Sequence, residues 1–305
     1  MTLRAESYRR YKHALRGAYN SLSLFQDVDD ESMAFVSAGE LEGKSALEVL
    51  AIMEGPIRKR LQRVGPSLLG KFLEKPRTRE LFFNNQKLTI PVLNEQAVEW
   101  YETSDVFNFD CVLETFLGLH HGARTIYDLG GHQGLWAAYY AGLCGEGGRV
   151  YSFEPSIINF ESSCLLFLMN DLVNVINVPF GVGDKPGLVR NVDSGGILVD
   201  FVEHNLGILR FDQVFFEPPD FIKIDIEGFE HELLASFPNL FKFCRNMHLE
   251  LHIPHLERRG VDYLETFRRI PFESVRVRNY QYGQLTEVGP NDKLSGYCSL
   301  MITPR

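Results

Sequence analysis

The 305-residue sequence is poor in residues that cross-link a chain or hold a structural metal. Its cysteines are scattered, odd in number and never spaced as a Cys-x-x-Cys pair, which argues against a disulfide framework and a zinc site of the usual spacing. That usage favours a reducing compartment. The five cysteines are Cys111, Cys144, Cys164, Cys244 and Cys298.

Long apolar runs and an excess of positive charge are lacking as well. No stretch approaches the roughly 18 apolar residues of a membrane span. The basic first segment, "MTLRAESYRRYKHALRGAY", has no continuous apolar core of a signal peptide. The net charge of −9 disfavours binding to nucleic-acid phosphates. We therefore expect a cytoplasmic protein with no stable membrane insertion and no nucleic-acid partner.

What the sequence does have, from about residue 105 onward, is an alternation of helical and strand-like runs that begins with a helical run at 107–119. The strand-like runs are "TIYDLG", "RVYSFEP", "VINVPFGVG", "DFIKIDIEG" and "NMHLELHI". Apolar strands separated by helices predict a parallel sheet covered on both faces, an α/β fold of the Rossmann-like doubly wound class. Residues 273–281 and 296–304 have no helix between them and predict a closing antiparallel pair.

Residues 1–95 differ from this pattern and are predicted to form a mainly helical extension with a hairpin. Short helices over 45–74 are separated by Gly-Pro pairs, and two β-prone runs within 80–93 predict the hairpin. We expect this extension to contact the substrate or to join two copies of the chain as a homodimer. Residues 96–305 are expected to form the domain that carries the chemistry.

The loop "DLGGHQG" follows the first predicted strand of that domain and precedes a helix. Gly130 and Gly134 permit a tight turn and a close approach of backbone to a ligand. The spacing is not that of a dinucleotide fingerprint, and Asp128 would repel a pyrophosphate but suits a cationic sulfonium. Glu154, at the end of the next strand, can accept both ribose hydroxyls. The set favours S-adenosylmethionine (SAM) over an ordinary strand–helix turn capped by Asp128.

The segments "YDLGGHQG", "SFEP", "GVGD" and "FIKIDIEGFEHELL" resemble the FkbM-type SAM-dependent methyltransferases over roughly residues 90–270. The resemblance implies a seven-stranded sheet whose last two strands are antiparallel. It also implies O-methylation of a hydroxyl on a sugar, glycan or polyketide-like small molecule. The residues expected to bind the cofactor are Asp128, Gly130, Gly131, His132, Gly134, Glu154 and Asp184.

The expected catalytic residues are Asp225, Glu250 and His252. Asp225 ends one strand, and the neighbouring strand places three ionisable residues on one face, which is unusual in a buried sheet. A histidine with a carboxylate behind it makes a general base, and the FkbM resemblance also implies a Glu-x-His here. His248 is interpreted as a core histidine, Glu230 as a complement to a helix dipole, and helix capping is the alternative for Asp225.

Two alternatives remain open at this point. Asp225, Glu250 and His252 are also acceptable ligands for a divalent metal, although we place metal-free base catalysis ahead of it. The whole chain could instead be a non-catalytic SAM-fold partner or scaffold protein. Glycines in the segment 193–201 predict a mobile loop over the acceptor.

Overall fold

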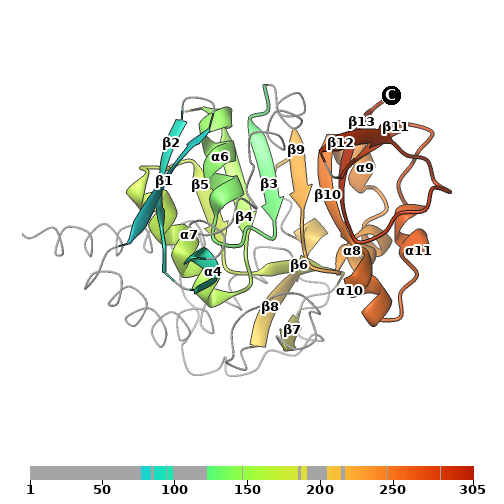
Figure 1. Ribbon diagram of the computed structural model, residues 1–305, viewed down its shortest axis with the longest axis horizontal. Coiled ribbons are helices and arrows are strands. Elements are labelled where there is room, and N and C mark those ends of the chain that lie inside the picture. Colours follow the sequence, from blue (N-terminus) through green and yellow to red (C-terminus); the bar gives the residue numbers. More distant parts are fainter. Residues whose placement is uncertain are drawn as a thin grey trace, which may run out of the picture.

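The computed structural model describes residues 77–83, 86–93, 95–98, 122–145, 147–184, 187–190, 205–213, 217–244, 246–281 and 283–305. The helices predicted over 45–74 and 107–119 and the loop predicted at 193–201 lie outside these residues. Within them, helices cover a central sheet of eight strands (Figure 1).

The central sheet has the strand order β12-β11-β13-β10-β9-β3-β4-β5. In chain order its strands are β3 (Thr125–Leu129), β4 (Arg149–Phe153), β5 (Val175–Val178), β9 (Phe221–Ile224), β10 (Met247–His252), β11 (Val275–Gln281), β12 (Gln284–Glu287) and β13 (Tyr297–Pro304). The helices that follow these strands are α6 (Leu135–Cys144), α7 (Ile157–Met169), α8 (Glu230–Ser236), α9 (Leu240–Phe243), α10 (Ile253–Arg258) and α11 (Tyr263–Phe267).

The strands β3, β4, β5, β9 and β10 run parallel, and β13 is antiparallel to both of its neighbours, β10 and β11. This confirms the predicted doubly wound α/β fold with its antiparallel closing pair. The short edge strand β12 adds an eighth strand to the seven expected. The chain leaves β3 toward β4 and later returns to β9 on the other side of β3. Ligands of doubly wound sheets bind where the strand order reverses in this way, at the carboxyl ends of the strands.

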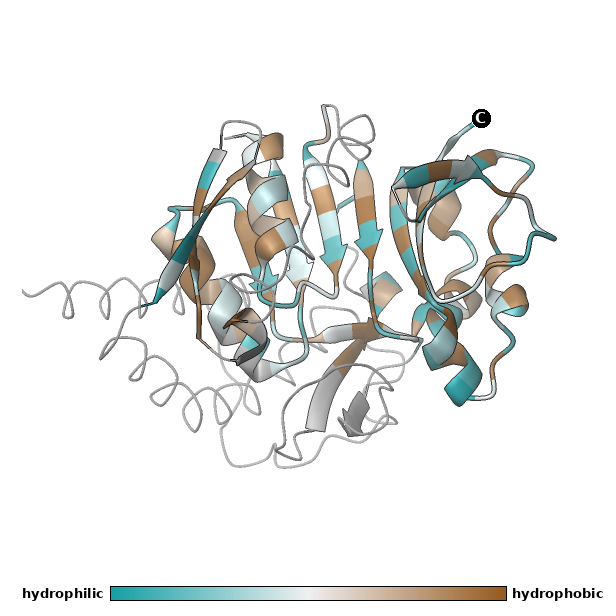
Figure 2. Ribbon diagram, in the orientation of Figure 1, coloured by the Kyte–Doolittle hydropathy of each residue, from teal (hydrophilic) through white to brown (hydrophobic). Residues whose placement is uncertain are grey.

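Apolar cores cover both faces of the sheet, which explains why the parallel strands are almost uniformly apolar. Ile126 and Phe221 pack with α6 and α7 on one face. Leu129 and Ile224 pack with α8, α9, α10 and α11 on the opposite face. Figure 2 shows brown strands between the helices, with teal segments toward the carboxyl ends of β3 and β9. Polar side chains therefore concentrate at the edge where a ligand is expected.

The segment 175–183, predicted as one strand, is divided. Pro179 has no N–H to donate to a ladder, and the chain turns there after β5. The next strand, β6 (Gly181–Gly183), instead pairs with β8 (Asn205–Arg210), and β8 pairs with β7 (Gly187–Arg190). The 3-10 helix η3 (Phe211–Gln213) follows β8. In Figure 1 this small sheet lies beyond the arrowheads of β3 and β9, beside the carboxyl edge of the central sheet.

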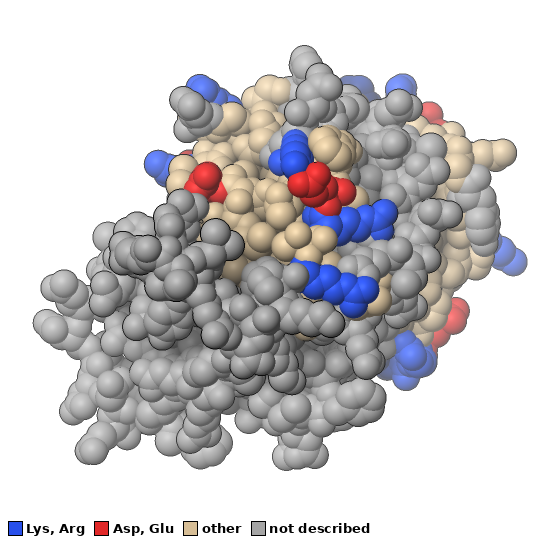
Figure 3. All heavy atoms as spheres, turned by 60° about the vertical axis from the view of Figure 1, so that its left-hand side comes forward, with Lys and Arg blue, Asp and Glu red and all other residues tan. Residues whose placement is uncertain are grey.

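A hairpin of β1 (Thr78–Phe83) and β2 (Gln86–Pro91) packs beside α7, followed by the short helix α4 (Glu95–Val98). Leu88 and Ile90 are buried in the core that contains α6. The side-chain amide of Asn170 accepts from the N–H of Thr89 (2.7 Å) and donates to its carbonyl oxygen (2.9 Å). Figure 3 shows basic and acidic side chains next to one another on this side of the molecule.

The cysteines of the described residues are Cys144, Cys164, Cys244 and Cys298; all four are buried, and no disulfide joins any two of them. In that same part of the chain no helix combines the length and the apolar character needed to cross a bilayer.

Candidate functional site

The glycine loop connects the end of β3 to the start of α6. Gly130 (φ 85°), His132 (φ 49°) and Gly134 (φ 88°) have left-handed backbone conformations. The N–H groups of Gly130 and Gly131 donate to the carbonyl oxygen of Phe153, at 3.0 and 2.9 Å. The loop is therefore tied to the end of β4, next to the point where the strand order reverses.

Other parts of the same chain pack so closely against Gly130, Gly131 and Gly134 that these positions have no room for a side chain. A Cβ at Gly130 would overlap the carbonyl oxygen of Asp225, and a Cβ at Gly131 would overlap the hydroxyl oxygen of Ser152. At Gly134 a Cβ would come within 2.6 Å of a side chain of α7. The glycine pattern in the sequence predicts that a ligand fills this space. In the structure the polypeptide fills it, so the glycines alone do not identify a cofactor.

Glu154 follows β4 and is buried. Its Oε2 accepts a hydrogen bond from the N–H of His132 (2.7 Å), and its Oε1 accepts one from the N–H of Ser156 (2.7 Å). Burial raises the pKa of Glu154 to about 7. The carboxylate therefore holds the loop in place and lies beside its backbone. Asp184, the other acidic residue expected at the cofactor, follows β6 and is partly exposed.

Asp128 is completely buried and faces a lysine. Lys223 Nζ lies 3.6 Å from Asp128 Oδ1 and 2.9 Å from Asp225 Oδ2. Burial alone would lower the pKa of Lys223, but Asp225 and Asp128 outweigh it and raise that pKa above its ordinary value. Burial raises the pKa of Asp128 to about 6. Lys223 thus supplies, from within the chain, the positive charge that we expected a ligand to bring to Asp128.

The loop after β3 and the turn after β9 are in direct contact. The N–H of Asp225 donates to the carbonyl oxygen of Leu129 (2.9 Å), and Lys223 Nζ donates to the carbonyl oxygen of Gly130 (3.4 Å). The two segments that carry the predicted cofactor and catalytic residues therefore form one continuous edge.

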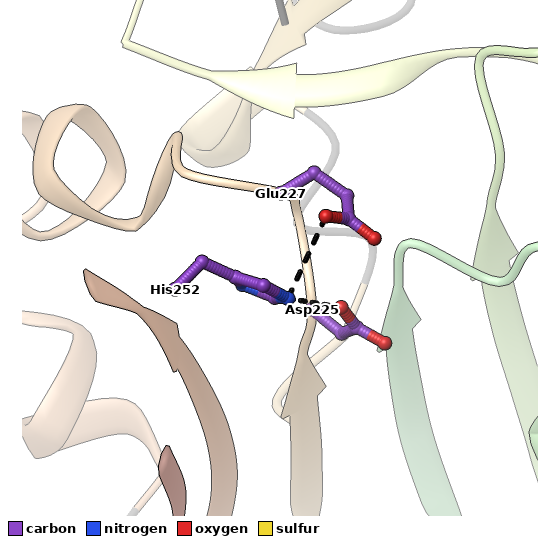
Figure 4. Close-up of side chains that lie close together, drawn as sticks. All are labelled: Asp225, Glu227 and His252. Atoms are coloured by element: carbon purple, nitrogen blue, oxygen red, sulfur yellow. Dashed lines mark ion pairs between the residues drawn. The ribbon is translucent and has the colours of Figure 1, made fainter. Parts of the chain in front are cut away.

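Three ionisable side chains meet at the carboxyl ends of β9 and β10. His252 Nε2 lies 3.5 Å from Asp225 Oδ1 and 3.6 Å from Glu227 Oε2. Figure 4 marks these two ion pairs with dashed lines. One ligand-type atom from each of the three residues lies within 4.8 Å of the other two. His252 is buried, whereas the side chain of Glu227 is 40% exposed. One side of this acidic–histidine cluster (Asp225, Glu227 and His252) is thus open to solvent.

Two buried polar residues, Glu230 and His255, contact the acidic–histidine cluster on the side away from solvent. Glu230 is wholly buried at the start of α8, and its Oε1 lies 2.9 Å from His252 Nδ1. His255 is also buried; its Nδ1 is 3.3 Å from Glu227 Oε2, and its Nε2 is 3.3 Å from the hydroxyl of Tyr297. The imidazole of His252 therefore has its Nδ1 engaged and its Nε2 directed at the two carboxylates.

The turn between β9 and α8 departs from the extended backbone assumed for it. β9 ends at Ile224, and Glu227 (φ 56°) and Gly228 (φ 97°) are left-handed. The N-terminal cap of α8 is Phe229, so Asp225 does not cap this helix. Asp225 and Glu227 therefore reach His252 from a turn, and not from the extended strand predicted over "DFIKIDIEG".

The face of β10 that points to α6 carries His248 and Glu250. His248 is buried and bonded to the hydroxyl of Ser299 (2.7 Å), as predicted for a core histidine. Its Nε2 lies 3.8 Å from Glu250 Oε1. Glu250 follows Leu249, the last β10 residue paired with β9, and it is close enough to Asp225 for the two carboxylates to repel each other. Glu250 lies beside the acidic–histidine cluster and not within it.

Carboxylates outnumber cationic side chains around the acidic–histidine cluster, and this excess shifts the pKa values of its members. Burial, and then the charge of Asp225, raise the pKa of both Glu227 and Glu250 to about 7. Burial would lower the pKa of His252, but its hydrogen bond to Glu230 and the charge of that carboxylate raise it to about 10. His252 is then an imidazolium at neutral pH and cannot accept a proton, which is at odds with the general-base role predicted for it.

Sequence reasoning brought Asp225, Glu250 and His252 to one region but missed two partners, Lys223 and Glu230. A lysine in the middle of an otherwise apolar strand was the available signal for Lys223, because a buried ammonium needs a carboxylate on a neighbouring strand. Glu230 stands at a helix start, where an acidic residue is explained by the helix dipole alone, so the sequence gives no sign of its contact with His252, 22 residues away.

Residues 128–282, about half of the chain, match the family model described as the methyltransferase FkbM domain. The chain belongs to this family. The FkbM domain match begins at Asp128 and includes the glycine loop, Glu154, Lys223 and the acidic–histidine cluster. No curated protein matches the sequence.

Solved methyltransferase structures resemble this FkbM-domain chain at low identity. The methyltransferase FkbM from Methylobacillus flagellatus KT is 18% identical, with 59% of this chain and 44% of that chain covered and a TM-score of 0.40. The O-methyltransferase from Bacillus cereus in complex with SAH is 19% identical (66% and 83% covered, TM-score 0.40). The O-methyltransferase TomG from Streptomyces achromogenes in complex with SAM is 15% identical (65% and 79% covered, TM-score 0.39). Family membership rests on the family match, not on these likenesses.

Proposed function

We propose that this chain is a SAM-dependent O-methyltransferase that acts on a hydroxyl group of a sugar, a glycan or a polyketide-like small molecule. The observation that carries the proposal is the direct contact between the glycine loop after β3 and the Asp225 turn after β9. It supports a site in which a cofactor on the loop and an acceptor at the acidic–histidine cluster face each other across one edge of the sheet. Membership in the methyltransferase FkbM domain family supports the same reaction class.

In this proposal Glu154 accepts the ribose hydroxyls of SAM, and the backbone N–H groups of the loop face the rest of the cofactor. Gly130, Gly131, His132 and Gly134 supply that backbone, and we assign Asp184, which follows β6, to the cofactor as well. Asp128 is too deeply buried to act alone on a ligand. We assign it an indirect role, in which it holds Lys223 against the carbonyl oxygen of Gly130.

Methyl transfer forms a bond from the acceptor oxygen to the methyl carbon, while the carbon–sulfur bond breaks and its electron pair stays on sulfur. The acceptor hydroxyl must also lose its proton. We assign that proton to Glu250, a partly buried carboxylate beside Asp225. Asp225 and His252 then position the hydroxyl, a task on which in-line transfer depends strongly.

Titration calorimetry of the full chain with SAM and with S-adenosylhomocysteine tests the cofactor. We expect micromolar binding of both, weakened in Glu154→Gln. Heat from neither compound would contradict the enzyme proposal and favour the scaffold alternative.

Labelled SAM with a panel of sugars and hydroxylated metabolites tests the acceptor. We expect Glu250→Gln to lose about 10²–10⁴ in kcat without a change in SAM affinity, as for removal of a general base. The matched control is Glu257→Gln, an exposed residue of α10. Equal activity of the two variants would overturn the assignment of Glu250.

A further inference from the structure

We propose that Asp225, Glu227 and His252 bind one divalent transition-metal cation of the Mn²⁺ or Zn²⁺ class. The sequence placed Glu250 in the alternative metal set and favoured metal-free catalysis. The structure instead puts Glu227 beside Asp225 and His252, and the surroundings of these three residues suit a cation.

The spacing of the candidate ligand atoms fits a metal site. In a tetrahedral site with bonds of about 2.1 Å, ligand atoms are about 3.4 Å apart. His252 Nε2 already lies 3.5 Å from Asp225 Oδ1 and 3.6 Å from Glu227 Oε2. One ligand atom from each of the three residues lies within 4.8 Å of the other two. The partly exposed side chain of Glu227 can make the small movement that would close the remaining edge.

The histidine is oriented as a metal ligand is. Metal-bound histidines almost always donate their second ring N–H to a carboxylate or carbonyl oxygen, which fixes the tautomer. Glu230 Oε1 takes this place at His252 Nδ1, at 2.9 Å, and is wholly buried. With Nδ1 held protonated by Glu230, a cation would displace the proton on Nε2, and the lone pair left on Nε2 is directed at Asp225 and Glu227.

The charge around the acidic–histidine cluster also calls for a cation. In the described part of the chain five carboxylates gather here against one lysine, Lys223, and the proton on His252. Buried negative charge in such excess is costly unless a cation or added protons neutralise it. The five carboxylates belong to Asp128, Asp225, Glu227, Glu230 and Glu250.

A second buried nitrogen points to the same place. His255 is 2% exposed, and within the described residues its Nδ1 has no hydrogen-bond partner. That atom lies 3.3 Å from Glu227 Oε2, and the His255 ring is stacked on His252 at 5.2 Å. Imidazole nitrogens beside carboxylate oxygens suit a transition metal better than Mg²⁺ or Ca²⁺, which prefer oxygen ligands alone.

The role that we give the cation in catalysis depends on the proposed methyltransferase function. A divalent cation lowers the pKa of a hydroxyl coordinated to it. The acceptor oxygen would then lose its proton to Glu250 more readily before it attacks the methyl carbon. Cation binding itself is independent of that step and is measured without SAM.

Calorimetric titration of the metal-free full chain with Mn²⁺ and with Zn²⁺ tests the site. We expect one equivalent per chain. Glu227→Gln and His252→Ala should each raise the Kd at least about ten-fold, and Glu230→Gln should raise it about 10–100-fold through the orientation of His252. The exposed control Glu257→Gln should leave the Kd unchanged.

A spectroscopic readout separates loss of a ligand from loss of the fold. Electron spin-echo spectra of the Mn²⁺-loaded wild type should show coupling to an imidazole nitrogen that disappears in His252→Ala, with thermal unfolding as the check on folding. No stoichiometric cation, or a Kd unchanged in both Glu227→Gln and His252→Ala, would overturn the proposal. SAM titration of the same samples shows separately whether the proposed function fails.

Discussion

Lys223 contacts both halves of the candidate site at once. Its ammonium pairs with Asp128 under the glycine loop and with Asp225 at the acidic–histidine cluster, and it also donates to the carbonyl oxygen of Gly130. Removal of one partner from a buried ion pair costs more than the pair contributes, because the other charge stays buried without compensation. The position of each half therefore depends on this one side chain.

We expect Lys223→Met to lower the free energy of unfolding by about 3–5 kcal/mol, since it leaves two carboxylates without their cation. Urea denaturation measures the loss. Lys242→Met, at an exposed position in α9, is the control and should stay within about 0.5 kcal/mol of wild type. Adding Asp128→Asn to Lys223→Met should recover part of the loss; strictly additive losses would mean that the two residues do not interact.

Glu154 makes stability depend on pH in a direction opposite to that of an ordinary surface carboxylate. Its pKa is about 7 in the folded protein because of burial, against 4.5 as its usual value. Between these two values the folded state holds this proton more than the unfolded state does, so the free energy of unfolding falls as pH rises and the loss is complete above about pH 7.

Unfolding in urea from about pH 4.5 to about pH 8 tests this, with Glu154→Gln as the variant that cannot titrate. Wild type should lose stability relative to Glu154→Gln as pH rises through this window. A difference that is constant, or that moves in favour of wild type, would show that the carboxyl is not raised in the folded protein.

At the scale of the element, the loop between β3 and α6 is shaped by the turn that follows β9. Gly130 has both a left-handed backbone and no space for a Cβ, because the carbonyl oxygen of Asp225 occupies it. The loop and the turn are therefore matched to each other before any ligand is considered.

Gly122 is a matched control for the contact between Gly130 and Asp225. Its φ is 79°, against 85° at Gly130, but a Cβ added at Gly122 would have no atom within 4 Å. We expect Gly122→Ala to cost about 1 kcal/mol, the strain of the backbone alone. Gly130→Ala should cost a further 1–3 kcal/mol, roughly the effect of overpacking, and should weaken SAM binding. Thermal and urea unfolding of the pair measure the difference, and equal losses would contradict the contact with Asp225.

At the scale of the whole molecule, the fold could be predicted because its strongest signals are local. Each parallel strand is a short apolar run between turn residues, and the missing helix before β13 marks the closing pair. The site was less predictable, because contacts such as His252–Glu230 and Asp128–Lys223 join residues distant in sequence. Nor does any local pattern predict that a glutamate takes the left-handed backbone seen at Glu227.

The hairpin of β1 and β2 shares a core with α6, so part of the predicted N-terminal extension is packed on the sheet. The division at residue 95 and the homodimer expected from the extension stay predictions. Analytical ultracentrifugation of the full chain would decide the second of them.

The left-handed turn at Glu227 has a consequence for the thermal tolerance of the protein. A glutamate held there costs about 1–2 kcal/mol of backbone strain, which asparagine bears more easily. We expect Glu227→Asn to raise the melting temperature while it weakens cation binding and slows turnover. Calorimetric melting beside an activity assay would show both effects, and a lower melting temperature would contradict the expectation. A library of variants selected for heat resistance alone would then replace Glu227 early. The positions replaced in such a selection would mark residues that the protein keeps for activity and not for stability.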